Sequence, residues 1–165
     1  MKEIKAVNGS VIQVDDDDYE ELSRYKWYLD GNGYAVRGEC VSMHRMIMKA
    51  PKGLVVDHIN HRPADNRKEN LRLCTTAQNS MNMSKRRKIY SSRYKGVRRL
   101  QAGRTGKPWL ANIRLSGRTI FLGSFDKEEH AAMAYDMWAR MLFGEFANTN
   151  FTPVCCSLEP LLVAS

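Results

Sequence analysis

The spacing of apolar residues along the chain predicts short strands and turns over residues 1–40. Strong turn signals at Asn8-Gly9 and Gly31-Asn32-Gly33 separate runs of β-prone residues. These runs predict strands at residues 4–7, 11–14 and 34–36. The acidic run at residues 15–18 precedes Tyr19, Leu22 and Tyr25 and predicts the start of a helix, because carboxylates there interact favourably with the helix dipole.

The pattern over residues 41–84 predicts a helix, a strand, a long loop, a second strand and another helix. A short helix is expected at residues 44–48, ended by Pro51 and Gly53. The β-prone run at residues 54–59 contains Asp57-His58, and a polar loop follows from Asn60 to Asn70. Residues 71–74 alternate like a returning strand, and residues 75–83 have helical character.

The pattern changes after residue 93 to three β-prone segments followed by one amphipathic helix. The segments are residues 94–99, 109–114 and 119–125. Asp126 and Glu129 form a capping-box pattern at the start of the helix, and Gly144 follows its last turn. The expected apolar helix face consists of Ala131, Ala134, Tyr135, Trp138 and Leu142. We therefore expect an α+β chain whose second half is a three-stranded sheet backed by a helix.

The net charge of +8 is concentrated in the second half of the chain. Residues 1–56 carry a net charge of −1, residues 57–84 carry +1 and residues 85–165 carry +8. This distribution indicates that the second half contacts a polyanion, although a merely basic surface is the plainer alternative. Between Lys85 and Arg99 there are eight basic residues and no acidic one, which fits either a solvated linker or a segment that follows a phosphate backbone.

Several classes of protein are disfavoured by composition. No apolar run approaches the roughly 18 residues of a membrane span, and no signal-peptide pattern follows Met1. The four cysteines include no C-x-x-C pair, which argues against a structural zinc site and a disulfide framework. We expect an intracellular protein that is not secreted and has no membrane partner. The expected organisation is a domain at 1–84, a basic linker at 85–92, a domain at 93–151 and a tail at 152–165.

Four side chains have the chemistry needed for phosphodiester hydrolysis. His58 suits the base that activates water at neutral pH. Oxygen ligands such as Asp57 and Asn79 suit Mg²⁺. Adjacent residues of a strand point to opposite faces, so Asp57 could hold the metal on one face while His58 works on the other. Asn70, at the start of the returning strand, is placed to orient the imidazole.

These residues belong to a longer pattern that resembles the HNH (His-Asn-His) endonucleases of phages and introns. Val56-Asp57-His58-Ile59-Asn60 is followed by Asn66, by Asn70-Leu71-Arg72 and by Asn79. Twelve positions separate His58 from Asn70, and nine separate Asn70 from Asn79. The resemblance extends over roughly residues 5–83 and includes His44-Arg45. His44 could contact phosphate, but a packed structural role is the favoured alternative.

The resemblance implies a ββα-metal nuclease domain in which each of these residues has a role. His58 would be the general base, Asp57 and Asn79 the metal ligands, and Asn70 the residue that fixes His58. The family's products carry a 5′-phosphate and a 3′-hydroxyl. Asn79 stands where one branch of the family has Asn rather than His, which leaves an all-oxygen site that favours Mg²⁺ or Mn²⁺ over zinc.

Residues 93–151 resemble the apetala-two (ethylene-response-factor) domain of plant transcription factors. The resemblance rests on five ordered blocks: Tyr94–Arg98, Trp109–Arg114, Leu122–Phe125, Ala131–Asp136 and Gly144–Phe151. In that family the sheet enters the major groove of double-stranded DNA. The candidate DNA-binding residues are Arg98, Arg114 and Trp109, with Arg99 and Arg118 as phosphate contacts and with Lys85, Arg86, Arg87 and Lys88 of the linker. Trp109 could equally be a core residue.

Two function classes remain in competition at this point. The main hypothesis is a metal-dependent DNA endonuclease, of the homing type and phage-like, acting in the cytoplasm of a bacterial host if it is phage-encoded. The alternative is a sequence-specific DNA-binding regulator whose nuclease motif is inactive, and a weaker possibility is a protein that binds or cuts structured RNA. The sequence favours a monomer without deciding the oligomeric state.

Overall fold

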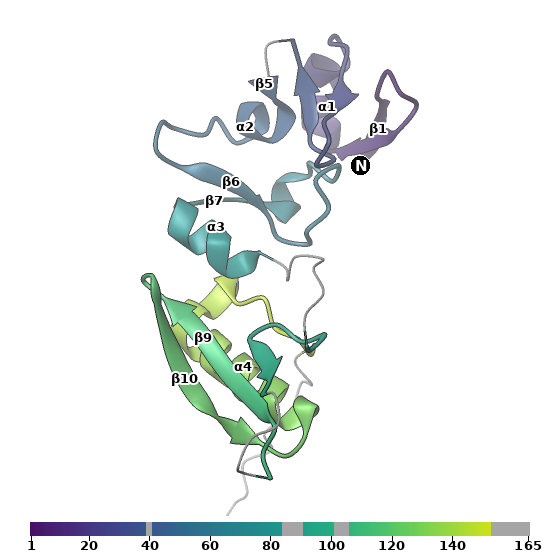
Figure 1. The fold of residues 1–165 in the computed structure, drawn as a ribbon. Coiled ribbons are helices and arrows are strands. Elements are labelled where there is room, and N and C mark those ends of the chain that lie inside the picture. Colours follow the sequence, from purple (N-terminus) through teal and green to yellow (C-terminus); the bar gives the residue numbers. More distant parts are fainter. Residues whose placement is uncertain (39–40, 84–90, 101–105, 153–165) are drawn as a thin grey trace, which may run out of the picture. The chain divides into compact units, whose positions relative to one another are not determined.

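The structure is a computed structural model in which residues 1–38, 41–83, 91–100 and 106–152 are described (Figure 1). The chain divides into two units, Met1–Ser84 and Lys85–Ser165. Each unit combines helices with antiparallel strands, so the α+β fold class is confirmed. Lys85, Arg86, Arg87 and Lys88 of the expected linker, and most of the expected tail, lie outside the described residues.

The first unit begins with a β-hairpin and a short helix. Strands β1 (Lys2–Lys5) and β2 (Val11–Val14) pair antiparallel, and helix α1 (Asp16–Leu22) follows directly. Three aspartates lie in the first turn of α1, where the helix dipole favours them, as the sequence predicted. The core of this region is made of buried apolar side chains from the hairpin, α1 and the segments that follow: Ile4, Ala6, Ile12, Val14, Leu22, Trp27, Ala35 and Met43.

A small three-stranded sheet and a second short helix complete the N-terminal region. Strands β3 (Tyr28–Leu29), β4 (Ala35–Arg37) and β5 (Val41–Ser42) pair antiparallel in chain order. Helix α2 (Met43–Ile47) follows β5 without a loop. It buries Met43 and His44, so His44 points into the protein rather than into solvent.

A hairpin followed by a helix forms the remainder of the first unit. Strands β6 (Val55–His58) and β7 (Leu71–Cys74) pair antiparallel with His58 opposite Leu71, and β7 has the predicted bounds. Helix α3 (Thr76–Asn82) begins immediately after Thr75, whose side chain forms a capping box with Gln78. The polar loop between the strands ends in a 3₁₀ turn, η1 (Lys68–Asn70).

The loop between β6 and β7 is attached to the N-terminal hairpin. Gln13 of β2 donates its backbone N–H to Ala64 O at 2.9 Å and accepts from Asn66 N at 2.8 Å. Asp15 Oδ2 accepts from Lys68 N at 2.7 Å, and the Lys68 ammonium lies 2.9 Å from the Asp18 carboxylate. Segments about 50 residues apart in the sequence therefore hold the loop in one conformation.

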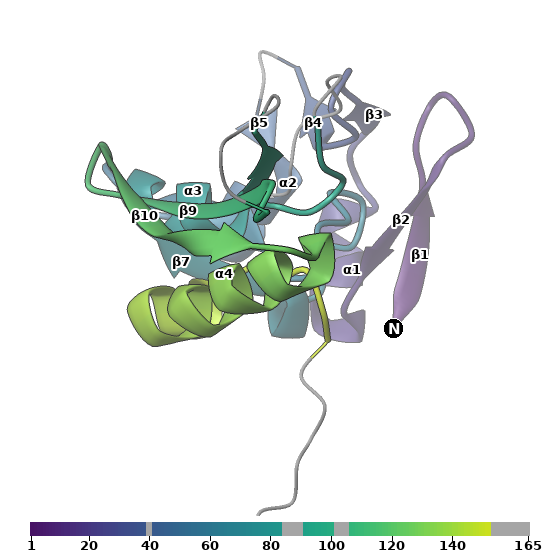
Figure 2. The same cartoon turned by 60° about the horizontal axis from the view of Figure 1, so that its bottom comes forward.

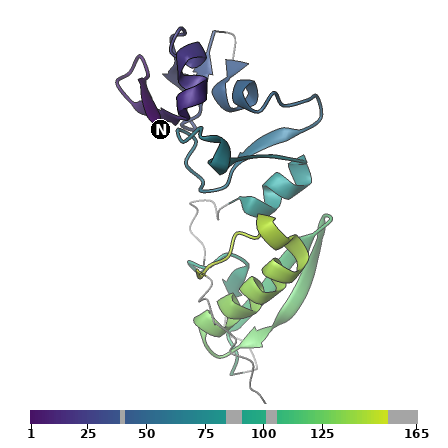
Figure 3. The same ribbon diagram turned by 180° about the vertical axis from the view of Figure 1, so that it is seen from behind.

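The second unit is a sheet with a single helix on one face. Strands β8 (Val97–Arg99), β9 (Trp109–Leu115) and β10 (Arg118–Phe125) form an antiparallel sheet in the order β10-β9-β8. Helix α4 (Glu128–Phe143) lies along this sheet, as Figures 2 and 3 show from two directions, and the 3₁₀ turn η2 (Gly144–Phe146) ends it. The predicted arrangement of three strands backed by one helix is confirmed.

Two details of α4 differ from the sequence prediction. Lys127, not Asp126, is the N-cap residue, and it makes no side-chain cap hydrogen bond. Asp126 instead lies 3.5 Å from His130 one helical turn later. The buried face also extends further around the helix than predicted, because Ala132, Asp136, Ala139 and Phe143 are buried whereas Trp138 and Leu142 are only half-buried. No helix among the described residues is long and apolar enough to span a membrane.

Candidate active site and DNA-binding surface

Asp57, near the end of β6, is a buried carboxylate held by two neighbours. Arg72 is its partner across the hairpin and donates from Nε and one terminal nitrogen to Oδ2, at 2.9 and 2.7 Å. Asn82 of α3 donates from Nδ2 to Oδ1 at 3.0 Å and to Oδ2 at 2.9 Å. Because a carboxylate oxygen has two lone pairs, Oδ1 keeps one acceptor position beyond the Asn82 contact.

His58, the last residue of β6, is buried without a hydrogen-bond partner. His58 is 5% exposed, and neither of its ring nitrogens is hydrogen-bonded within the described residues. Burial lowers the pKa of the imidazole, against the opposing influence of the Asn66 side chain and of the carboxylates of Asp57 and Asp65. The ring is therefore neutral at pH 7, the form in which it can accept a proton.

Two further aromatic rings surround His58. The ring centroids of Tyr34 and His44 lie 5.6 and 5.2 Å from that of His58, and 5.4 Å from each other. Burial, followed by the charges of His58 and Arg45, lowers the pKa of His44 to about 4. The packed environment of His44 agrees with the structural role favoured from the sequence. Its position against His58 gives it a direct effect on how that ring is held.

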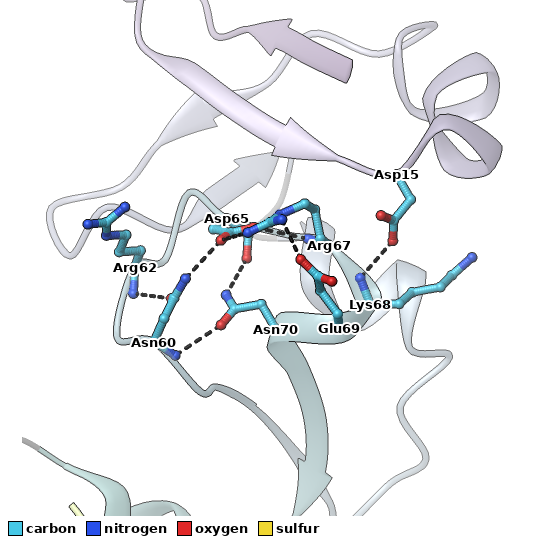
Figure 4. A network of polar contacts seen from close by, with 8 residues as sticks. All are labelled: Asp15, Asn60, Arg62, Asp65, Arg67, Lys68, Glu69 and Asn70. Atoms are coloured by element: carbon cyan, nitrogen blue, oxygen red, sulfur yellow. Dashed lines mark hydrogen bonds and ion pairs between the residues drawn. The ribbon is translucent and has the colours of Figure 1, made fainter. Parts of the chain in front are cut away.

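The side chain of Asn70, expected to fix His58, makes no hydrogen bond to the His58 ring, whose two nitrogens have no partner among the described residues. Its Oδ1 accepts from Asn60 N at 2.9 Å, and its Nδ2 donates to Asp65 O at 2.8 Å (Figure 4). Both ends of the amide are thus used to close the loop between β6 and β7. Asn70 fixes the backbone on either side of that loop, and any influence on His58 passes through the chain rather than through a direct hydrogen bond.

The loop has a second organising group, the buried carboxylate of Asp65. Arg67 donates to both of its oxygens at 2.8 Å, and Asn60 Nδ2 donates to Oδ2 at 2.8 Å (Figure 4). The guanidinium of Arg67 holds the pKa of the Asp65 carboxyl below its usual value. Arg67 also pairs with Glu69. This network keeps the polar loop rigid next to the strand that carries Asp57 and His58.

Asp57, His58 and Asn79 line one pocket of about 320 Å³. Its full lining is Tyr34, Asp57, His58, His61, Pro63, Asn79, Asn82 and Met83. The Asn79 side chain makes no hydrogen bond within the described part of the chain, so its carbonyl oxygen is available. No group of three or more His, Cys, Asp or Glu positioned for a metal ion occurs among the described residues. A cation here would have few protein ligands, which suits Mg²⁺ because it retains several waters.

Comparison with known proteins connects this geometry to a family. The model of the HNH endonuclease family matches residues 48–81, which span β6, β7 and nearly all of α3. An HNH endonuclease of Acanthamoeba polyphaga mimivirus is 37% identical over 150 residues, covering 86% of this chain and 75% of the relative. The chain belongs to the HNH endonuclease family. Its enzyme class, a nuclease, follows from this membership.

Plant transcription factors are similar to a smaller part of the HNH endonuclease. An AP2/ERF and B3 domain-containing transcription repressor of Arabidopsis thaliana is 43% identical over 65 residues, or 39% of this chain and 17% of the relative. An ethylene-responsive transcription factor of the same plant is 42% identical over 82 residues, or 47% of this chain and 40% of the relative. The chain thus spans less than half of these plant relatives. No solved structure matches.

The sheet of the second unit presents basic side chains on the face opposite α4. Strand register places Arg98 beside Leu110, Arg114 beside Thr119, and Phe121 beside Asn112. Trp109 and Ala111 pack toward the helix core, so the alternate residues of β9 point away from α4. Arg98 and Arg114 are exposed on this outer face, and the Phe121 side chain, 60% exposed, lies with them.

The other candidate DNA-binding residues of the second unit do not lie on this outer face; they are Trp109, Arg99 and Arg118. Trp109 is half-buried and packs against the core between the sheet and α4, which agrees with the core alternative, while its contact with DNA stays a prediction. Arg99 pairs with Trp109 in the strand register, and its guanidinium lies 5.7 Å from the centre of the indole ring. Arg118 begins β10 at the hairpin turn, on the same side of the sheet as α4.

Sequence reasoning missed Asn82 and Arg72, the two residues that hold Asp57. Asn82 lies three positions after Asn79 on α3, so the helical repeat places both on the face that lines the pocket. Arg72 is directly opposite Asp57 in the hairpin, and this pairing of opposite charges follows once the register of β6 and β7 is known. Both signals were present, but each depends on an exact register.

Proposed function

We propose that this HNH endonuclease hydrolyses phosphodiester bonds of double-stranded DNA in a metal-dependent reaction, with His58 as the general base. The observation that carries the proposal is the state of the His58 ring. It is buried and neutral, both of its nitrogens are free of protein hydrogen bonds within the described residues, and it lines a pocket with Asp57 and Asn79. A neutral imidazole next to an open pocket can remove a proton from an attacking water.

Asp57 and Asn79 are the proposed ligands of Mg²⁺ or Mn²⁺. Asp57 Oδ1 keeps an acceptor position, and the Asn79 carbonyl lines the same pocket, so the donors are the hard oxygens these cations prefer. Such a cation, when bound, stabilises negative charge on the phosphate and on the departing oxygen. Arg72 and Asn82 fix the Asp57 carboxylate before any ligand arrives. We propose products with a 5′-phosphate and a 3′-hydroxyl.

The second unit is the proposed DNA-binding domain. Arg98 and Arg114 on the outer face of its sheet are suited to base edges in the major groove, while Arg99 and Arg118 at the margins are suited to phosphates. The similarity to plant transcription factors and the net charge of +8 over residues 85–165 support this assignment. We propose a monomeric enzyme of the homing type, encoded by a phage-like element, in which this domain gives affinity and register.

Cleavage of supercoiled plasmid tests the proposal directly. The protein is incubated with plasmid in Mg²⁺ and in EDTA, alongside the His58→Ala variant. We expect nicked or linear DNA in Mg²⁺ only, and a loss of rate of about 10²- to 10⁴-fold in the variant, because a general base contributes that much. DNA binding by the variant should be unchanged. Tight, salt-sensitive binding without cleavage of any substrate would instead identify a DNA-binding regulator.

A further inference from the structure

Tyr34, which immediately precedes β4, lines the active-site pocket but has no part in the reaction proposed above. It shares this pocket with Asp57, His58 and Asn79. Tyr34 lies before residues 48–81, the part of the chain that the family model matches, so the family likeness assigns it no role. The N-terminal region therefore contributes a side chain to a site whose other proposed residues come from β6 and α3.

The turn between β3 and β4 fixes the backbone of Tyr34. Asp30 Oδ1 accepts from Asn32 N at 2.8 Å and from Tyr34 N at 2.9 Å. Asp30 N donates to Tyr34 O at 2.9 Å, so both backbone polar groups of Tyr34 are bonded to Asp30. Gly33, at φ +87°, lies beside Pro63, because a Cβ atom added to it would be 3.8 Å from Pro63 Cγ. The turn is thus held next to the loop between β6 and β7.

The Tyr34 ring is packed, whereas its hydroxyl is unpaired. The ring centroid lies 5.4 Å from that of His44 and 5.6 Å from that of His58, with interplanar angles of 56° and 53°. Tilted aromatic pairs at such distances attract each other. The hydroxyl of this half-buried residue makes no hydrogen bond within the described part of the chain. A tyrosine hydroxyl can donate one hydrogen bond, and this donor is unused.

The charges of the pocket explain why a neutral donor is useful there. The Asp57 carboxylate lines the pocket and repels the negative charge of a phosphodiester. The guanidinium of Arg72 already donates twice to that carboxylate, at 2.9 and 2.7 Å. A phosphate in this pocket therefore needs hydrogen-bond donors beyond the cation proposed at Asp57. Tyr34 supplies such a donor without adding charge.

We propose that the Tyr34 hydroxyl donates a hydrogen bond to a non-bridging oxygen of the phosphate that is cleaved. This inference rests on the proposed function, in which His58 removes a proton from the attacking water. A donor at this position stabilises the negative charge that develops on the phosphate oxygens during hydrolysis, so it acts mainly on the transition state. Tyr34 is then a catalytic residue, and the N-terminal sheet is part of the active site.

The variant Tyr34→Phe tests this contact because it removes the hydroxyl and keeps the packed ring. The lost hydroxyl has no partner in the protein, so the melting temperature should stay within about 2 °C of the wild type. The single-turnover rate of plasmid cleavage in Mg²⁺ should fall by about 10²-fold, as when one donor to a developing negative charge is removed. The Kd for duplex DNA should change by less than about twofold, because other phosphate contacts determine affinity.

Tyr28→Phe is the matched control. It makes the same chemical change in β3 of the same sheet, at a residue that is 48% exposed and does not line the pocket. This variant should cleave at the wild-type rate. A wild-type cleavage rate in Tyr34→Phe would overturn the proposal. Equal losses of rate in the two variants would overturn it as well, since the hydroxyl at the pocket would then have no specific effect.

A measurement without cleavage separates failure of this inference from failure of the proposed function. Full-length protein labelled with ¹³C at the ζ carbon of tyrosine is titrated with a short DNA duplex in EDTA, and the Tyr34 signal is assigned by its absence in Tyr34→Phe. We expect this signal to shift on DNA binding, and to shift more than that of Tyr28. An unmoved Tyr34 signal in a complex that fluorescence anisotropy shows to be formed contradicts the contact. A shifted signal in a protein that cuts no DNA supports the contact and contradicts the proposed function.

Discussion

Asp136 in the second unit and His58 in the first are both buried, yet their surroundings are opposite. Asp136, on α4, accepts hydrogen bonds from Asn150 N at 2.8 Å, from Asn150 Nδ2 at 2.9 Å and from Phe151 N at 2.8 Å. His58 has no hydrogen bond at either nitrogen within the described residues. The first group ties the segment after η2 to the helix. The ring nitrogens of His58 can instead form hydrogen bonds with a molecule that is not part of the protein.

This difference extends beyond the two residues. Every buried side-chain nitrogen or oxygen without a hydrogen-bond partner, among the residues that the structure describes, belongs to the first unit. Two of the residues concerned lie at the pocket, because His58 lines it and the ring of His44 packs against that of His58. Unsatisfied buried groups lower stability, so they persist where function requires them. The comparison teaches that the buried carboxylate of Asp136 stabilises the second unit, whereas the first unit keeps several buried polar atoms without partners among the described residues.

Removing the Asp136 carboxylate should have the largest effect on stability. Asp136→Ala leaves the backbone N–H groups of Asn150 and Phe151 without an acceptor, while Asn150 Nδ2 keeps its bond to Lys95 O. We expect the second unit to lose about 3 kcal/mol, since each buried group left unpaired costs about 1–3 kcal/mol. Amide hydrogen exchange measured by mass spectrometry reports each unit separately and should show faster exchange in α4 and β9 only. Asp126→Ala, which removes an exposed carboxylate from the same unit, should change exchange little. Equal effects of the two variants would contradict a structural role for Asp136.

The outer face of the sheet should account for the next largest effect. Arg114→Ala is expected to weaken DNA binding by roughly tenfold, because an arginine on base edges contributes about 1–3 kcal/mol. Arg118→Ala removes the same charge from the helix side of the sheet and should reduce affinity by only about twofold, with a slightly smaller salt slope. Equilibrium titration of duplex DNA at several salt concentrations distinguishes them. A larger loss for Arg118→Ala would place the binding surface on the other face.

Replacing the orphaned imidazole with an apolar ring should stabilise the first unit. His58→Phe keeps a ring against Tyr34 and His44 but carries no polar atoms that need partners. We expect an increase in the free energy of unfolding of about 1 kcal/mol together with the loss of cleavage, because the penalty of an unpaired buried group is removed. Urea denaturation followed by tryptophan fluorescence measures the change. A clear loss of stability would mean that the His58 ring has partners in solution.

The sequence predicted the order of elements because each has a local signal. The returning strand β7 and strand β2 have the expected bounds, since alternation and flanking turn residues mark both. The cap of α4 was wrong because Asp126 and Lys127 differ by one position, which a capping pattern does not resolve. The sequence could not decide whether Trp109 faces DNA or the core, because the alternation of β9 fits both orientations. Only the position of α4 shows which face of the sheet is the core.

The site was predicted as a set of residues more successfully than as a set of contacts. The motif identified Asp57, His58 and Asn79, which do line one pocket. The motif could not assign hydrogen-bond partners to the two asparagines of the loop, Asn66 and Asn70. Sequence spacing does not show where the side-chain amide of each one points. Only the contacts with Gln13, Pro63, Asn60 and Asp65 distinguish them, and the contact with Gln13 joins residues far apart in the sequence.

Asp65 offers the smallest expected effect, a dependence of stability on pH that is specific to the catalytic unit. Its carboxylate is buried and accepts from Arg67 and Asn60. Arg67 holds the pKa of this carboxyl below its ordinary value in the folded protein. A carboxyl group has a pKa of about 3.9 in an unfolded chain. The folded state is therefore favoured above that pH, and the contribution disappears as pH falls through the folded pKa.

Asp65→Asn should make the first unit less sensitive to acid. We expect the wild-type melting temperature to fall more steeply than that of the variant between about pH 5 and pH 3, since only the wild type must protonate this carboxylate. The effect is small because Arg67 is partly exposed and water weakens the ion pair. Asp17→Asn, which changes an exposed aspartate of α1, should follow the wild type. If the melting temperature of Asp65→Asn depends on pH as that of the wild type does, the charge of the Asp65 carboxylate does not contribute to stability. The loop is then held by its hydrogen bonds with Asn70 and Gln13 rather than by the ion pair with Arg67.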